Sequence, residues 1–558
     1  GKALKGTCGI GHTRWATHGE PSQVNAHPHV SGNCEKSGSG TVESEVVGVH
    51  NGIIENYTEL KEKLLKHGYT FYSDTDTEVV IKLVDYYYKK YNLGPIDAIA
   101  KTMVRVRGSY ALELMFKDYP GEIWVARKDS PMIIGIADGE TYVASDVPAI
   151  LKYTRNVYYI GNLEFAKLTP GEAHFYDLNG DEIEKETTEI KWDAEAAEKA
   201  GFEHFMMKEI YEQPKAIRDT LNSVVKDGVI DFTDIDLTEE EIKKYSQIYI
   251  VACGSAWHVG VEAQYVIEEM AQIPVRVELA SEFRYREMPL VKDGLVIVIS
   301  QSGETADTLA AMRMAKEKGL ATLAVVNVIG SSIAREADKV FYTLAGPVAT
   351  TKGYSAQLVA LDCIAVQFAK VKGLITDEQY SYYISELQTI PDKIEKILQD
   401  KERIQWFAAK YANAHDVFFV GRGVDYAVCL EGSLKLKEIS YIHSEAYAAG
   451  ELKHGTISLI EDNILVIGVL TQSKLYEKTV SNMMECKSRG AYLMGVTNYG
   501  NYEMEDKVDF TVYVPKVDEH FMGSLTVIPL QLLGYYVSVA KGLDVDKPRN
   551  LAKSVTVE

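Results

Sequence analysis

The stretch LVIVISQSGET, residues 295–305, indicates a buried strand that runs into a polar turn. Apolar residues Leu295 to Ile299 precede Ser300-Gln301-Ser302-Gly303-Glu304-Thr305, and the segment from Ala306 to Lys318 has helical spacing. Hydroxyl groups and free backbone N–H groups at the positive end of a helix dipole suit a phosphate monoester. The same residues could form an ordinary helix cap, so this turn alone leaves both interpretations open.

An internal repeat strengthens the case for phosphate. The spacings Ser302–Gly319–Asn327 and Ser473–Gly490–Asn498 are identical. In each copy one apolar strand precedes a Gln-Ser pair and a second apolar strand ends the unit. These strands are at 295–299 and 321–326 in the first copy and at 464–470 and 491–496 in the second. The C-terminal half is therefore predicted to be two tandem doubly wound α/β units.

The two copies differ where a ligand would bind. A strand that ends in glycine precedes each copy, at 248–254 and at 417–423. The first copy continues with Gly303-Glu304-Thr305, but the second has Lys474-Leu475-Tyr476 at these positions. We therefore expect only the first copy to hold phosphate.

The composition is that of an enzyme of several domains. The 558 residues include 59 Lys and Arg against 80 Asp and Glu, a net charge of −21, with no basic cluster among aromatic residues, which argues against nucleic acid and anionic membrane as partners. The six cysteines show no CxxC and no histidine at zinc spacing, which indicates a reducing compartment and no structural metal. No apolar run approaches the roughly 18 residues of a membrane span, and the first residues contain no signal peptide, so we expect a cytoplasmic protein.

Residues 1–190 have a different pattern. Strands are predicted at 46–49, 111–116, 122–126, 132–137 and 141–144, with a helix at 57–67. Turns separate most of these strands, which indicates an α+β domain with antiparallel pairing. Residues 31–45 are rich in Gly and Ser and are expected to form an exposed loop, and residues 185–200 are expected to link the two halves.

Three polar clusters in this half carry candidate binding groups. They are His12-Thr13-Arg14-Trp15-Ala16-Thr17-His18-Gly19, then His50-Asn51-Gly52 and Ser73-Asp74-Thr75-Asp76-Thr77-Glu78, the last two each after a candidate strand. Arg pairs with a carboxylate, Asp pairs with an ammonium group, and an Asn amide beside a Gly N–H can form an oxyanion hole. Together they suit an amino acid bound for acyl transfer. Taken singly, Asn-Gly is more commonly a hairpin turn, and Asp-Thr-Asp-Thr-Glu a helix cap.

The chain resembles the glutamine:fructose-6-phosphate aminotransferase family, the glucosamine-6-phosphate synthases, over essentially its whole length. The strings at 12–19, 50–56, 300–305, 434–455 and 548–558 match those of the family. The resemblance implies an N-terminal-nucleophile glutaminase of αββα layers, here incomplete, followed by two sugar-isomerase (SIS) domains. Glutamine would be hydrolysed in the first half, and the ammonia passed internally to fructose 6-phosphate in the second.

The resemblance also implies domain bounds and an assembly. It predicts a truncated type 2 glutamine amidotransferase domain at 1–190, a linker at 191–240, SIS domains at 241–385 and 405–540, and a catalytic tail at 541–558. It implies a homodimer or higher homo-oligomer that needs no cofactor and no metal. The substrates implied are L-glutamine and fructose 6-phosphate.

Carried over residue by residue, the resemblance assigns three groups of site residues. The glutamine and oxyanion residues are Arg14, Trp15, His18, Asn51, Gly52 and Asp76. The sugar-phosphate residues are Ser255, Ser300, Gln301, Ser302 and Thr305. The catalytic residues are Lys435, Glu438 as the base that moves a proton between C1 and C2, His454 from a neighbouring subunit for ring opening, and Lys553 for a Schiff base with the ketone.

General chemistry limits what these residues show by themselves. A carboxylate such as Glu438 takes and returns a proton best when burial raises its pKa towards neutrality. Lys435 is three residues before Glu438 on the same helical face, and the plain interpretation is a surface ion pair worth about 0.2–0.5 kcal/mol. Lys553 lies close to the end of the chain, where chains usually fray, and a single histidine such as His454 is more often structural.

Three departures from the family pattern matter. The family nucleophile is a Cys several dozen residues before the His-Thr-Arg-Trp motif, which begins here at residue 12. We therefore expect that the chain lacks this segment, that Cys8 is a buried strand residue, and that the polypeptide as written has no glutaminase activity. The loop at 345–352 is shorter than in the family, and Ala256 stands where many members have Ser.

Two other classes of function remain open from the sequence. One is a glutamine-independent sugar-phosphate isomerase or deglycase, which would have no need of Arg14, Asn51 and Asp76. The other is a non-catalytic sugar-phosphate sensor, which would have no need of Glu438, His454 and Lys553 together. A purine-pathway amidotransferase is excluded, because no acidic strand-loop for a phosphoribosyl group follows the glutaminase half.

Overall fold

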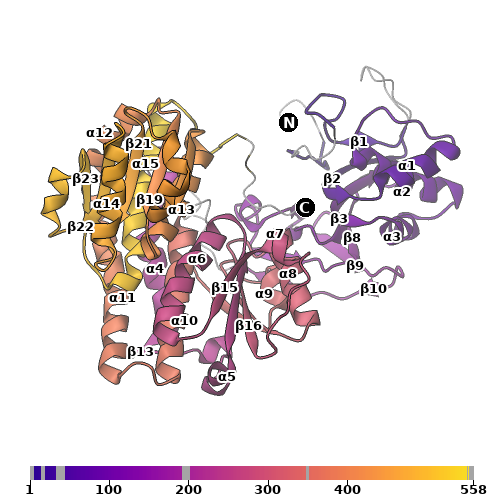
Figure 1. Ribbon diagram of the computed structural model, residues 1–558. Helices are drawn as coiled ribbons and strands as arrows, with labels where there is room; N and C mark the ends of the chain where they lie inside the picture. Colours follow the sequence, from indigo (N-terminus) through magenta and orange to yellow (C-terminus); the bar gives the residue numbers. More distant parts are fainter. Residues whose placement is uncertain are drawn as a thin grey trace. The chain divides into compact units, whose positions relative to one another are not determined.

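The computed structural model describes residues 6–13, 19–32, 44–190, 201–346, 351–549 and 551. The chain forms two compact units, one with the described residues up to 190 and one with those from 201 onwards (Figure 1). Each unit is described by itself.

The first unit contains two antiparallel sheets and three helices. The seven-stranded sheet has the order β1 (His29–Val30), β2 (Val46–Ile54), β3 (Gly108–Phe116), β4 (Ile123–Lys128), β8 (Glu164–Thr169), β9 (Glu172–Tyr176), β10 (Glu182–Ile183). The four-stranded sheet has the order β11 (Thr188–Glu189), β7 (Asn156–Tyr159), β5 (Ile133–Ala137), β6 (Glu140–Ala144). The helices are α1 (Tyr57–Lys66), α2 (Asp76–Lys90) and α3 (Pro95–Arg105).

Alternating side chains of the larger sheet explain the layers of this unit. Leu112, Leu114 and Trp124 pack with the helices, whereas Ala111 and Val125 pack against the smaller sheet. A strand turns successive side chains to opposite faces, so both faces of the larger sheet become core. In residues 44–190 the outer face of the smaller sheet packs against the short 3₁₀ helix η1 (Val147–Ala149) and the residues that follow it, Ile150 and Leu151.

The second unit contains both predicted α/β repeats. The elements before the first parallel sheet are α4 (Phe205–Val224), β12 (Val225–Lys226), β13 (Val229–Ile230) and α5 (Glu239–Lys244). The first repeat comprises β14 (Gln247–Ala252), α6 (Gly254–Ala271), β15 (Val275–Leu279), α7 (Ala280–Phe283), β16 (Gly294–Ser300), α8 (Ala306–Glu317), β17 (Ala321–Val326), α9 (Ser332–Glu336), β18 (Lys339–Tyr342) and α10 (Lys352–Val371). After α11 (Asp377–Leu398) and α12 (Lys401–Tyr411), the second repeat comprises β19 (Asp416–Gly421), α13 (Val424–Ser440), β20 (His443–Ala448), the 3₁₀ helix η4 (Ala449–His454), β21 (Leu465–Leu470), α14 (Tyr476–Lys487), β22 (Tyr492–Asn498), β23 (Phe510–Val514) and α15 (Gly523–Ala540).

The two repeats have the same topology. The parallel sheets run β15-β14-β16-β17-β18 and β20-β19-β21-β22-β23. In the first sheet Ile248 and Ile250 pack towards α6 and α10, whereas Tyr249 and Val251 pack towards α7, α8 and α9 (Figure 1). The central strands β16 and β21, which are covered by helices on both faces, are almost wholly apolar and fully buried, as the sequence predicted.

One core spans both repeats. Residues of α4, α6, α10, α11, α13 and α15 belong to a single cluster of buried apolar side chains. Among the described residues, one helical segment, Glu519–Ala540, is long and apolar enough to cross a membrane, but 94% of its apolar window is buried inside the protein. We therefore interpret α15 as a core helix.

Some predicted elements differ in detail. The strand predicted at 46–49 continues as β2 to Ile54, because it pairs along its whole length with β3. Residues 69–72 before the Asp-Thr-Asp-Thr-Glu cluster are not a strand, and that cluster caps α2 through Thr75, whose hydroxyl accepts from Glu78 N. Cys8 is partly exposed and lies in a bend, so its assignment to a buried strand was wrong. Ser31 in the predicted exposed loop is buried, because its hydroxyl is bonded to Asp85 Oδ1.

Candidate functional site

The turn from Ser300 to Thr305 lies between β16 and α8, at the carboxyl edge of the first parallel sheet. The hydroxyls of Ser300 and Thr305 lie 2.9 Å apart, and Gly303 N donates to Ser300 Oγ at 3.0 Å. Glu304 N donates to Ser302 Oγ at 3.2 Å. Three hydroxyls thus gather around the first turn of α8, a grouping that suits the oxygens of a phosphate.

Gly303 is required by this geometry. Its φ is +68°, and a Cβ placed on it would lie 2.0 Å from Ser331 Oγ. Any other residue would therefore meet both backbone strain and a clash. The neighbouring Gln301 has a buried side-chain oxygen with no hydrogen-bond partner among the described residues. A buried polar atom without a partner is expected where a ligand completes the hydrogen bonding.

A buried carboxylate, Glu431 of α13, joins the two repeats beside this edge. Strands β14 and β16 pair side by side, Ala252 with Ile299, so α6 begins next to the Ser300 turn. From α6, Ser255 Oγ donates to Glu431 Oε1 at 3.0 Å, and His258 Nδ1 lies 2.8 Å from Glu431 Oε2. The Glu431 side chain is 0% exposed. Ser255, predicted near the phosphate, thus also contacts the second repeat.

The charged residues of α13 continue from Glu431 towards the surface. Lys435 Nζ lies 3.6 Å from Glu431 Oε1 and 2.6 Å from Glu438 Oε2. The Lys435 side chain is 3% exposed, whereas that of Glu438 is 21% exposed. The interpretation of Lys435 and Glu438 as a surface ion pair was therefore wrong, because α13 packs against α15, β20 and α6 and Lys435 is buried in this packing.

The charges of this group support one another. Burial alone would raise the pKa of Glu431, but the Lys435 ammonium and the hydrogen bonds of His258 and Ser255 lower it below its usual value. Burial alone would lower the pKa of Lys435, but Glu431 and Glu438 raise it above its usual value. Lys435 is therefore held as an ammonium between two carboxylates, so it can donate a hydrogen bond but cannot attack a carbonyl.

The equivalent turn of the second repeat is filled by the protein itself. Asp425 Oδ2 accepts from Thr471 N at 2.8 Å and from Gln472 N at 3.2 Å. Ser473 N donates to Glu519 Oε1 at 3.2 Å. Two carboxylates thus occupy the N–H groups that an anion would use. Asp425 is the second residue after Gly423, just as Ala256 is the second after Gly254.

In the first unit, β2 and α2 carry the described candidate residues for glutamine. Asn51 and Gly52 lie within β2, opposite Ala111 and Tyr110. Gly52 has φ +145°, and a Cβ there would lie 2.1 Å from Ser109 O, so only glycine fits. Asp76 is the first residue of α2, and its Oδ2 accepts from Ile54 N at 2.8 Å, which ties the helix start to the end of β2.

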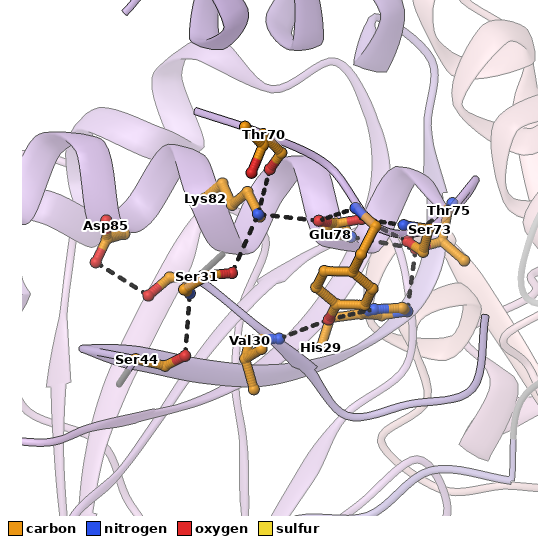
Figure 2. A network of polar contacts seen from close by, with 12 residues as sticks. His29, Val30, Ser31, Ser44, Thr70, Ser73, Thr75, Glu78, Lys82 and Asp85 are labelled. Atoms are coloured by element: carbon orange, nitrogen blue, oxygen red, sulfur yellow. Dashed lines mark hydrogen bonds and ion pairs between the residues drawn. The ribbon is translucent and has the colours of Figure 1, made fainter. Parts of the chain in front are cut away.

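A buried polar network holds the start of α2 in place. Figure 2 shows Glu78 bound by Ser73 and by Lys82, whose ammonium also contacts the Thr70 carbonyl. Glu78 Oε2 accepts from Ser73 N and from Ser73 Oγ, each at 2.7 Å, and Lys82 Nζ lies 3.0 Å from Glu78 Oε1. Thr75, beside Asp76, contacts His29 Nε2 at 3.0 Å. These fully buried partners fix the backbone on which Asp76 sits.

Several predicted site residues are not brought together by the described structure. Arg14, Trp15, His18 and Lys553 lie outside the described residues, as do residues 347–350 of the short loop at 345–352. His454 is exposed at the end of η4 in the second repeat. Among the described residues, no group of three or more His, Cys, Asp and Glu side chains is arranged to hold a metal.

Sequence reasoning missed Glu431, His258 and Asp425. Glu431 lies four residues before Lys435, so the spacing of residues 431, 435 and 438 marks one charged face on an otherwise apolar helix. That signal was available. His258 and Asp425 gave no comparable signal, since each acts across a contact between elements far apart in the sequence.

Comparison with known proteins adds to this geometry. Residues 241–367 and 410–541 match the SIS domain, and residues 38–152 match the glutamine amidotransferase domain. The glutamine–fructose-6-phosphate aminotransferase (isomerizing) of Caldanaerobacter subterraneus subsp. tengcongensis is 54% identical over 560 residues, which cover 100% of this chain and 90% of that protein. The protein of the same name from Clostridium acetobutylicum is 53% identical, with the same coverage. The structure of the C-terminal domain of glucosamine-fructose-6-phosphate aminotransferase from Francisella tularensis is 39% identical, with a TM-score of 0.60 over 63% of this chain and 100% of that one.

Proposed function

This chain belongs to the family of isomerizing glutamine–fructose-6-phosphate aminotransferases, and on that premise we propose which of its residues carry the reaction. The reaction takes the amide nitrogen of glutamine to fructose 6-phosphate and yields glutamate and glucosamine 6-phosphate, an amino sugar of hexosamine biosynthesis. The observation that carries the proposal is the buried Glu431–Lys435–Glu438 group of α13, tied to the first SIS domain beside the Ser300 turn.

The sugar phosphate binds at the turn after β16. Ser300, Ser302 and Thr305 supply hydroxyls, the buried side chain of Gln301 supplies a further polar group, and Ser255 lies at the neighbouring strand end. A phosphate at the N-terminus of α8 gains the helix dipole and charge-assisted hydrogen bonds. The chemistry of the ligand fits this edge of a doubly wound sheet, where such folds bind their ligands.

Proton transfer belongs to Glu438. Lys553 attacks the C2 ketone with loss of water and forms an imine, and ammonia then displaces the lysine. Glu438 takes a proton from C1 and returns it at C2, while the O1 proton passes to the nitrogen, so that C1 becomes the aldehyde and the C2 imine becomes the amine. Lys435, an ammonium beside Glu438, donates a hydrogen bond to a sugar oxygen and stabilises negative charge there. His454 of a neighbouring copy assists ring opening, so the proposal includes a homodimer or larger homo-oligomer.

Glutamine binds in the first unit. Arg14 holds its carboxylate, Asp76 its ammonium group, and Asn51 with Gly52 the oxyanion, and we assign His18 and Trp15 to the same site. Two observations support this assignment. The hydrogen bond from Ile54 N to Asp76 fixes the start of α2, and β2 and β3 approach closely at Gly52. We also propose the domain bounds predicted from the sequence and a cytoplasmic location. The domains are the glutamine amidotransferase domain at 1–190, the linker at 191–240, the SIS domains at 241–385 and 405–540, and the catalytic tail at 541–558.

Two assays test the proposal. The first supplies fructose 6-phosphate without a nitrogen donor and follows glucose 6-phosphate, which isolates the isomerase half. Wild-type protein should form it and Glu438→Gln should not, whereas full activity of Glu438→Gln would contradict the assignment of the base. The second adds glutamine to a protein in which the family's nucleophilic Cys precedes this sequence, and it measures glutamate and glucosamine 6-phosphate; Asp76→Asn is expected to abolish both.

The Schiff base has its own test. Borohydride added with fructose 6-phosphate should reduce the imine and attach a hexitol phosphate to Lys553, which peptide mass spectrometry detects. Lys553→Ala is the matched control and should show no labelled peptide. Labelling at another lysine, or labelling that persists in the variant, would contradict the role of Lys553.

A further inference from the structure

His258 of α6 is the one histidine in contact with the buried carboxylate Glu431 among the described residues. We propose that His258 is a positioning residue of the isomerase site: it fixes the Glu431 carboxylate from the first SIS domain, and Glu431 in turn orients Lys435 beside Glu438. This inference rests on the roles proposed above for Lys435 and Glu438.

The contact geometry supports a fixed orientation. Both oxygens of Glu431 are bound from one helix, Oε2 by His258 Nδ1 at 2.8 Å and Oε1 by Ser255 Oγ at 3.0 Å. A carboxylate only accepts hydrogen bonds, so the ring proton lies on Nδ1. Because both oxygens are held, the Glu431 carboxylate keeps one orientation. Lys435 Nζ, which lies 3.6 Å from Glu431 Oε1, therefore has its charge partner in a fixed position.

The surroundings show why Glu431 depends on this donor. Glu431 is fully buried, and an ionised carboxylate in such a place needs hydrogen bonds as well as a counter-charge. The charged and titratable groups around it are Lys435 on its own helix, His258 on α6 and Tyr354 on α10, and Tyr354 is itself bonded to Glu262. Loss of His258 would leave Ser255 as the sole donor from α6.

His258 also faces a pocket of about 370 Å³. The pocket is lined by α6, α13 and β20, and its charged residues are Lys437 and Glu445. The His258 side chain is 10% exposed. A small molecule can therefore reach the place of the imidazole when the side chain is shortened.

The main experiment compares His258→Leu with His258→Asn in the full chain, using isomerisation of fructose 6-phosphate without a nitrogen donor. His258→Leu should lower kcat about tenfold or more and leave KM within about twofold, because the phosphate turn is untouched. The acid limb of its kcat–pH profile should move to higher pH, since one of the causes that lower the pKa of Glu431 is removed. His258→Asn keeps an N–H at the position of Nδ1 and should restore most of kcat.

The matched control is Gln264→Leu. Gln264 lies on the same helix and donates to Val275 O at 2.7 Å, but it does not touch Glu431. The change removes a hydrogen bond of α6 and should leave kcat per folded molecule and the pH profile unchanged. A purely structural role for His258 would make the His258→Leu and Gln264→Leu variants alike in these readouts, and that result would overturn the proposal.

Two further measurements keep the inference separate from the proposed function. Imidazole should restore several-fold activity to His258→Ala through the pocket, and absence of rescue would count against the proposal. Crystal structures should show the Lys435 ammonium displaced from Glu438 in His258→Leu and still beside Glu438 in His258→Asn. If Glu438→Gln were fully active, the proposed base would fail, yet the crystal structures would still decide whether His258 positions Lys435.

Discussion

The turn after β16 and the turn after β21 hold equivalent places in the two SIS repeats but satisfy their polar groups differently. In the first, hydroxyls of Ser300, Ser302 and Thr305 gather around the start of α8. In the second, Asp425 and Glu519 accept hydrogen bonds from the turn between Thr471 and Ser473. Backbone N–H groups at such a turn need an anion. The second repeat supplies side-chain carboxyl groups, whereas in the first the hydroxyls of Ser300 and Ser302 accept from Gly303 N and Glu304 N.

The two repeats also differ in the helix that follows β14 in the first and β19 in the second. Here it is the second repeat that carries the charged groups. In the first repeat α6 offers Ser255 and His258, which are donors. In the second, α13 carries the buried charges Glu431 and Lys435. On the roles proposed above, binding and proton transfer are divided between the two copies of the fold.

The largest effect is expected from Lys435→Met. The change removes the counter-charge of the buried Glu431, which should cost about 3–5 kcal/mol in the free energy of unfolding and abolish isomerase activity. Urea unfolding and the glucose 6-phosphate assay measure the two effects. Lys437→Met is the control, because Lys437 is exposed on the same helix. Equal destabilisation by both variants would contradict a specific role for the buried pair.

A pH-dependent effect is expected from Asp425→Asn. Burial raises the pKa of Asp425 from 3.8 to about 6, so the folded protein favours the neutral acid. The stability from this group is complete below about pH 3.8 and is lost as pH rises through 6. From pH 4 to 7 the free energy of unfolding of wild type should therefore fall relative to the variant, by about 2–3 kcal/mol.

Urea titrations of both proteins across this range measure the difference. Asp506→Asn, which removes an exposed acid of the same repeat, controls for the loss of one charge. A wild-type–variant difference that is the same at pH 4 and pH 7 would contradict the raised pKa of the buried Asp425 carboxyl.

Phosphate binding distinguishes the two turns directly. Ser302→Ala and Thr305→Ala should each weaken binding of fructose 6-phosphate by about 1.5–3 kcal/mol, because each removes a hydrogen bond to a charged group. Ser473→Ala, the matched change in the second repeat, should leave the Kd unchanged. Isothermal titration calorimetry measures all three, and similar losses in both repeats would mean that the sugar binds elsewhere.

The smallest effect is expected from changes of the turn backbone. Gly303→Ala places a Cβ at positive φ and close to Ser331 Oγ, which should cost about 1–2 kcal/mol in stability. Lys474→Ala at the matching position of the second repeat should be neutral. Thermal unfolding compares the two, and an unchanged Tm for Gly303→Ala would indicate that the turn adjusts freely.

The repeats could be predicted from sequence because their signal is local. Five apolar residues before Ser300, helical spacing after Thr305 and a second copy at constant spacing each report on neighbouring residues only. The strand ends were nearly right, with β16 at Gly294–Ser300 and α8 starting at Ala306. Strand β2 was underestimated, since its polar second half is strand only because β3 pairs with it.

The candidate site was harder because its contacts are distant in sequence. Lys435 was assigned to the catalytic group through the family resemblance, whereas its spacing to Glu438 by itself suggested a surface ion pair, because nothing in the sequence of this helix shows that Lys435 is buried. His258 and Glu431 are bound across two domains, and Asp425 reaches a turn more than forty residues later. Burial and long-range pairing decide such roles, and a single sequence records neither.

The hydrogen bonds from Ser255 and His258 to Glu431 also bear on how these domains can be inherited. A gene fragment that encodes the second repeat alone would bury a carboxylate without its donors, and a fragment that encodes the first alone would lose the partner of both donors. Neither repeat can be moved into another protein without new polar partners.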